Sequence, residues 1–176
     1  MKIMLSPSYF GEKEKTLFEH GKMSLSLFKY STGICGMTLK NARGYITVLP
    51  FKGFQVWRAC FDEHELVMKT LFDEPTQSTE YCKTYGAFLI HCGLTAIGNP
   101  DVAAGDTHPL HAELPNIGYD KAWAVCGEDE NGRGRNGISG SSDFFAVSFT
   151  AVLFTFQFKK SLAQMSRPVQ KNSDGL

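Results

Sequence analysis

The sequence predicts an all-β, mainly antiparallel protein, and three observations lead to that prediction. Short runs rich in β-branched and aromatic residues follow one another along the first half of the chain. Pro, Gly and polar clusters separate these runs, which is the spacing of antiparallel strands joined by turns. No long stretch shows the 3.6-residue hydrophobic period of a helix. With 176 residues and 43% hydrophobic content, the chain is long enough to bury a core.

The first expected strand covers residues 24–30, where polar and apolar side chains alternate as in a half-buried strand. A polar turn is expected over residues 62–65. Helix signals are weak, and we expect one short helix over Glu12–His20. The remaining strands are predicted from short runs of β-branched and aromatic residues: Tyr45–Leu49, Gln55–Trp57, Leu66–Met68 and Trp123–Val125.

The Phe-rich run Phe144–Phe158 is predicted to be a buried strand. It is shorter than the ~20 residues of a membrane-spanning helix, and Ser, Thr and Gln interrupt it. The tail from Lys159 is polar and without pattern, so we expect it to be frayed. We therefore expect no membrane partner.

Composition excludes several classes of function. Lys plus Arg and Asp plus Glu both number 18, and no basic stretch is interleaved with aromatic residues, so a nucleic-acid partner is not expected. The N-terminus has too short an apolar patch for a secretory signal. The cysteines lie singly with no CxxC pair, which indicates reduced thiols in a cytoplasmic protein rather than a disulfide framework or zinc ribbon. They are Cys35, Cys60, Cys82, Cys92 and Cys126.

The candidate site lies in the segment 99–116, which is rich in Asp, Gly, His, Pro and Asn and is expected to be a long loop. Its imidazoles and carboxylates are suited to acid–base chemistry, because histidine titrates near neutral pH. Two alternatives stay open. His108 and His111 could ligate a metal with Glu113 or Asp106, although no third ligand has a diagnostic spacing, so we predict no metal. The side chains could instead hydrogen-bond the backbone of their own loop.

His91 is a secondary candidate for substrate binding. It lies within the apolar run Phe88–Cys92, where a histidine is more often a hydrogen-bonded core residue than a catalyst. Nothing in the sequence places a base beside Cys92, so we do not expect a nucleophilic thiol. Trp57 and Trp123 could stack on a sugar ring, but both lie in strand-like segments where a core role is expected.

Four motifs follow one another along the chain: Val48–Trp57, the segment from Met68 through Glu74–Pro75, Tyr85–Gly93 and His108–Asn116. Together they resemble the aldose 1-epimerase-like family of the galactose mutarotase-like superfamily. Their order and spacing agree with that family over about residues 1–140, and the last motif is the most specific.

The resemblance implies a β-supersandwich that binds a sugar in a cleft. Such proteins open a cyclic hemiacetal and reclose it, using an imidazolium acid and a carboxylate base and no cofactor. The family pattern HGELPN corresponds to residues 111–116, with Ala112 in place of the usual glycine. His111 is thereby implied as the catalytic residue that contacts the sugar, with Glu113 and Asn116 as cleft or loop-fixing residues. Together with the candidates found from the residues themselves, the expected substrate-binding set is His108, Glu113, Asn116 and His91.

The resemblance ends near Gly140, whereas chains of that family are close to twice as long. We therefore expect residues 1–140 to be the N-terminal part of a mutarotase-like sandwich and residues 141–176 to be a divergent segment. The expected function is a carbohydrate-binding isomerase impaired by loss of the half that carries the base. The alternative is a non-catalytic or vestigial sugar-binding domain. An incomplete sandwich would also expose sheet edges through which copies could associate.

Overall fold

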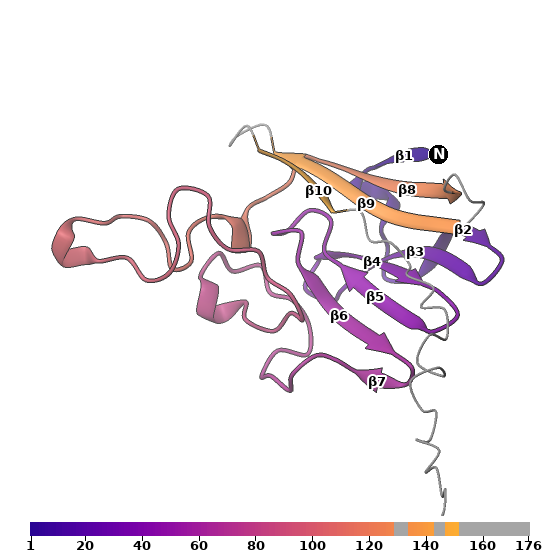
Figure 1. Cartoon of the computed structure of the whole chain (residues 1–176), viewed down its shortest axis with the longest axis horizontal. Coiled ribbons are helices and arrows are strands. Elements are labelled where there is room, and N and C mark those ends of the chain that lie inside the picture. The colour runs from indigo at the N-terminus through magenta and orange to yellow at the C-terminus, as the bar shows by residue number, and fades with distance from the viewer. Residues whose placement is uncertain (129–133, 143–146, 152–176) are drawn as a thin grey trace, which may run out of the picture.

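The computed structural model describes residues 1–128, 134–142 and 147–151, and it shows two antiparallel sheets. A four-stranded sheet with the order β1-β8-β9-β10 lies above a six-stranded sheet with the order β2-β3-β4-β5-β6-β7 (Figure 1). The helical turns in the described residues are short 3-10 segments. The predicted all-β, antiparallel class is therefore confirmed.

The six-stranded sheet is a meander in which each strand pairs with the next along the chain. Its strands are β2 (Lys15–His20), β3 (Met23–Lys29), β4 (Cys35–Lys40), β5 (Gly44–Val48), β6 (Val56–Phe61) and β7 (His64–Glu65). In the other sheet β1 pairs with β8, which is far away in the sequence. That sheet consists of β1 (Lys2–Leu5), β8 (Lys121–Glu128), β9 (Gly134–Ser142) and β10 (Val147–Ala151).

The core lies between the two sheets. In the large sheet, Leu25 of β3 pairs with Leu39 of β4, and both side chains are buried because alternate residues of a strand point to the same face. The small sheet contributes Leu5, Ala122 and Ile138 to the same cluster. Both sheets bury apolar faces against each other, so the arrangement is a β-sandwich.

Most predicted strands are confirmed, since β3, β5, β6 and β8 overlap the expected runs. The helix expected over Glu12–His20 is wrong, because residues 15–20 form the edge strand β2. Pairing with β3 decides its conformation, and half-buried Leu17 and Phe18 pack against the core. The strand expected at Leu66–Met68 is also wrong. Strand β7 ends at Glu65, and the exposed Leu66 and Met68 have no sheet face to cover.

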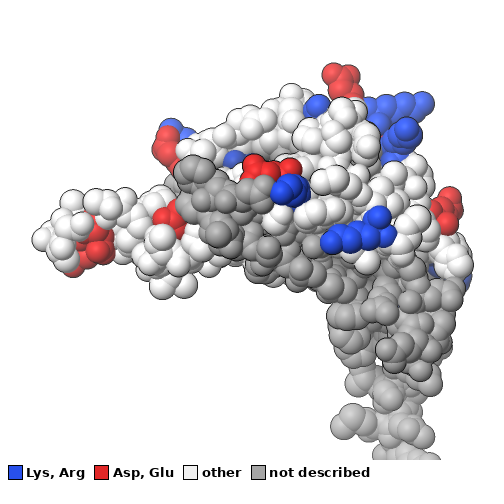
Figure 2. All heavy atoms as spheres, turned by 90° about the horizontal axis from the view of Figure 1, so that it is seen from above, with Lys and Arg blue, Asp and Glu red and all other residues white. Residues whose placement is uncertain are grey.

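The boundary expected between residues 140 and 141 falls within β9, which continues to Ser142 and pairs with β10. Strand β10 covers part of the Phe-rich run, and the rest of that run and the tail from Lys159 lie outside the described residues. No helix in the described ranges is long and apolar enough to span a membrane. Acidic and basic side chains are interspersed over the face seen in Figure 2, with acidic groups at the projecting end of the molecule.

Residues 66–120 connect β7 to β8 and form a lobe without strands beside the sandwich (Figure 1). The lobe contains the 3-10 helices η2 (Tyr81–Lys83), η3 (Val102–Ala104) and η4 (Leu114–Asn116). Arg58 of β6 binds the first half of the lobe to the sandwich. Its guanidinium donates to the carbonyls of Gly86 and Asp73 at 3.1 and 2.9 Å. Connections this long without strands or α-helices are uncommon in compact domains, and ordered ones are often functional.

The second half of the lobe is held by the tight turn that joins β5 to β6. In this turn Gly53 has a φ of 56°, and its N–H donates to the Ile117 carbonyl at 2.8 Å. The fully buried Gln55 donates through Nε2 to the Pro115 carbonyl at 2.7 Å. A Cβ at Gly53 would lie 2.1 Å from the same carbonyl oxygen. Only glycine therefore allows this approach.

The substitution Gly53→Ala tests the docking of this turn. We expect a loss of several kcal/mol in the free energy of unfolding, because the clash adds to the strain of a positive φ. Gly21→Ala is the matched control, since Gly21 has a φ of 57° and nothing within 4 Å of its Cβ position. The control should lose only about 1–2 kcal/mol. Urea unfolding measures both losses, and equal losses would show that the contact with Pro115 is unimportant.

Candidate functional site

The candidate residues of the 99–116 loop all lie in the second half of the lobe, but they do not converge on one point. His108 belongs to a network at the projecting end, Glu113 bonds to Thr95, and His111 packs on Tyr81. Asn116 lies on the side that faces the sandwich and lines a pocket there. The loop therefore offers four separate environments rather than a single acid–base cluster.

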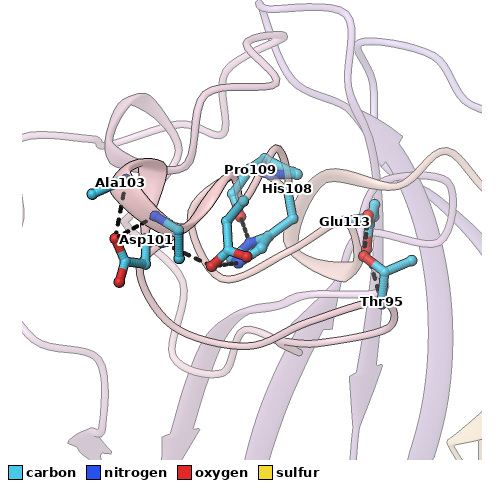
Figure 3. A network of polar contacts seen from close by, with 8 residues as sticks. Thr95, Asp101, Ala103, His108, Pro109 and Glu113 are labelled. Carbon is cyan, nitrogen blue, oxygen red and sulfur yellow. Dashed lines mark hydrogen bonds and ion pairs between the residues drawn. The ribbon is translucent and has the colours of Figure 1, made fainter.

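The network around His108 holds the loop itself together (Figure 3). His108 donates through Nδ1 to the Pro109 carbonyl at 2.9 Å, and its Nε2 lies 3.8 Å from Asp106 Oδ2. Asp106 in turn accepts from the backbone N–H of Asp101 at 2.8 Å. Asp101 caps η3 by accepting from the N–H of Ala103 at 3.1 Å. These polar groups are used in folding the loop.

Glu113 is bound by Thr95 rather than poised as a base. Thr95 donates to the carboxylate through its hydroxyl at 2.6 Å and through its backbone N–H at 3.3 Å (Figure 3). The hydroxyl bond is the main reason that the pKa of Glu113 is lowered from its usual value. A carboxylate whose charged form is stabilised in this way is a weak proton acceptor.

His111 is held in a backbone conformation that is costly for a residue with a Cβ. His111 and Ala112 both have a φ of 61°, which costs about 1–2 kcal/mol per residue. Three backbone hydrogen bonds fix this turn, among them Gly93 N–H to the His111 carbonyl at 2.9 Å and His111 N–H to the Gly98 carbonyl at 2.8 Å. A positive φ of this size favours glycine, so Ala112 is strained by its Cβ.

The His111 imidazole is part of a row of three aromatic rings. Its centroid lies 4.4 Å from the Tyr81 ring, and the Tyr81 ring lies 5.5 Å from that of Tyr85. Burial, with smaller contributions from neighbouring Cys92 and Tyr85, raises the pKa of Tyr81 to about 12. Tyr81 therefore stays neutral and keeps its hydroxyl proton, whereas Tyr85 presents an exposed ring. We call Tyr81, Tyr85 and His111 the aromatic row.

A pocket of about 340 Å³ lies between the lobe and the turn after β5. Asn116 forms part of its wall and donates through Nδ2 to the Thr79 carbonyl at 3.1 Å. Lys52, half-buried, enters from the turn. Its lining does not include His111. The described residues that line it are Ile34, Cys35, Phe51, Lys52, Gln77, Thr79, Asn116 and Gly118.

His91 belongs to the lobe and is half-buried, next to the backbone of Phe54. Burial lowers the pKa of its imidazole, and the hydrogen bond with the Phe54 backbone opposes that shift. A neutral, backbone-bonded ring fits the core role considered for it.

Trp57 is buried beneath the lobe, and Trp123 in β8 lies under the Lys2 ammonium, 4.3 Å from the ring centroid. Neither indole belongs to the aromatic row.

In the described part of the chain, no group of three His, Cys, Asp or Glu side chains is arranged to hold a metal ion. Sequence reasoning missed Tyr81, Tyr85 and Lys52. Lys52 lies in one of the four family-like motifs, so that motif could have drawn attention to it. Tyr81 has no such signal, because its partner His111 is 30 positions further along the chain.

No family model matches the chain, and no match is found among curated proteins or solved structures.

The substitution Thr95→Val tests the state of the Glu113 carboxylate. We expect the pKa of Glu113 to rise toward its usual value, because the strongest donor to the carboxylate is removed. A lowered pKa stabilises the fold above the pKa of an unfolded glutamate, and this contribution disappears as pH falls through the folded pKa. Thr95→Val should reduce that pH dependence. An NMR titration of the carboxyl carbon measures the pKa, with Thr95→Ser, which keeps the hydroxyl, as the control.

Proposed function

We propose that this chain is an aldose 1-epimerase-like carbohydrate-binding protein, and that the aromatic row on the lobe contacts the sugar. The observation that carries the proposal is the row itself. It joins the exposed ring of Tyr85, the Tyr81 hydroxyl and an imidazole held by a strained turn. The C–H face of a pyranose packs on an exposed aromatic ring, while hydroxyl and imidazole groups provide hydrogen bonds to sugar hydroxyls.

The sequence resemblance supports this assignment from a different direction. The pattern at residues 111–116 implies that His111 contacts the sugar, and His111 lies in the aromatic row. Backbone strain of the kind found at His111 and Ala112 is typical of functional sites, where the surrounding structure holds a side chain in one position. His108 and Glu113 are loop-fixing residues in this proposal.

Binding is favoured over ring-opening because no described carboxylate is paired with the His111 ring. Anomer interconversion needs a base for the anomeric hydroxyl and an acid for the ring oxygen. Glu113, the carboxylate of the same motif, is engaged by Thr95 and has a lowered pKa. Isomerase activity is the second candidate, favoured by the strained and fixed position of His111.

Saturation-transfer NMR with a panel of free aldoses tests the binding. We expect millimolar binding, and we expect Tyr85→Ala to weaken it about tenfold, because removing a stacked ring costs about 1–1.5 kcal/mol. Tyr9→Ala is the matched control, since Tyr9 is also an exposed tyrosine and lies on η1 (Pro7–Tyr9), outside the lobe. Affinity that is unchanged in Tyr85→Ala would contradict the assignment.

Exchange spectroscopy on the same samples separates the two candidates. A binding protein leaves anomer exchange at the rate in buffer, which is the result we expect. Faster exchange that disappears in His111→Ala would instead establish the isomerase, with His111 as its acid–base residue.

A further inference from the structure

The pocket beside Asn116 contains a half-buried cation with no described acidic partner. The Lys52 Nζ donates to the Ser78 carbonyl at 2.7 Å, which uses one of its three N–H groups. Burial lowers the pKa of this ammonium, because removal from water disfavours the charged form. Arg43, by contrast, pairs with Asp62, and Lys83 with Glu80 at 2.7 Å.

An ammonium removed from water without a counterion costs free energy, so buried charges are normally paired. The described lining of this pocket consists of one cation, amide and hydroxyl groups and apolar surface, and no Asp or Glu is among these residues. Gln77 and Asn116 each use one amide N–H on a backbone carbonyl, at 3.0 and 3.1 Å, and each amide carries a second N–H. The volume of about 340 Å³ is that of a small-molecule site.

The pocket and the aromatic row are built from the same two segments. Gln77 and Thr79 line the pocket, and the same segment continues to Tyr81 and Tyr85. In the second segment, His111 belongs to the row and Asn116 to the pocket. The bond from Asn116 Nδ2 to the Thr79 carbonyl joins the two segments. A sugar on the row would therefore lie on the same lobe as a cationic pocket.

We propose that the Lys52 pocket binds the oxyanion of an acidic sugar, either a phosphate ester or a carboxylate. Lys52 supplies the positive charge, and Gln77, Thr79 and Asn116 supply neutral donors around it. The sugar part of this assignment rests on the proposed function, whereas the oxyanion site is carried by the lining of the pocket alone. A sugar phosphate and a sugar carboxylate share the same features, which are a compact oxyanion and a ring with hydroxyl groups.

Titration of ¹⁵N-labelled protein with inorganic phosphate, a hexose 6-phosphate, a hexuronic acid and an unmodified hexose tests the proposal. We expect phosphate to shift the amide signals of residues 52, 77–79 and 116, and one acidic sugar to bind at least tenfold more tightly than phosphate or the unmodified hexose. The tighter of the two acidic sugars identifies the phosphate or the carboxylate as the natural anion. Acidic sugars that bind no more tightly than phosphate would overturn the assignment of a sugar ligand.

Lys52→Met removes the charge and keeps much of the apolar stem. We expect it to weaken binding of phosphate and acidic sugar at least tenfold, and Lys52→Arg to restore part of it. The urea midpoint of Lys52→Met should stay the same or rise, because this variant removes an unpaired, half-buried charge. Lys15→Met, at an exposed position that lines a separate pocket, is the control and should bind as the wild type does.

The two proposals fail separately. Phosphate binding that Lys52→Met abolishes and Tyr85→Ala leaves intact supports the oxyanion site, even if no unmodified aldose binds. Aldose binding that depends on Tyr85 supports the proposed function, even if phosphate does not bind. Equal phosphate affinity in the wild type and Lys52→Met, or no phosphate binding at tens of millimolar, would overturn the oxyanion site.

Discussion

The candidate site depends on the docking of the turn between β5 and β6 against the end of the lobe. Gly53 and Gln55 bind the backbone of residues 115–117, at distances that leave no room for a Cβ on Gly53. Two segments about 60 residues apart are thereby locked together beside the edge of the sandwich. The pocket exists because this contact brings Lys52 of the turn next to Asn116 of η4.

The polar composition of the lobe is used mainly for its own folding. A connection without strands must satisfy its backbone groups locally, and Asp101, Asp106, His108 and Glu113 do this with bonds to neighbouring backbone and hydroxyl groups. Groups employed in this way have limited capacity for a ligand. The groups that remain available for a ligand are those of the aromatic row and of the Lys52 pocket.

Binding and catalysis make different demands on such a lobe. An exposed ring with neighbouring hydrogen-bonding groups is sufficient to hold a sugar, whereas hemiacetal opening requires an acid and a base at opposite ends of the reacting bond system. The strained turn at His111 meets a need common to both, because it fixes the imidazole against Tyr81. Glu113 accepts hydrogen bonds from Thr95 and has a lowered pKa, so it stabilises the loop and is poorly suited to accept a proton from a substrate.

The sequence by itself determined the antiparallel all-β class and the position of the long loop, because strand alternation and turn residues act over a few positions. Residues 24–30 and 45–49 could be recognised in this way. Tertiary structure decided the rest. Residues 15–20 became a strand because β3 offered a partner, and Tyr81 met His111 only through the path of the lobe. Contacts between distant segments depend on packing and register in three dimensions, and local spacing along one chain does not encode them.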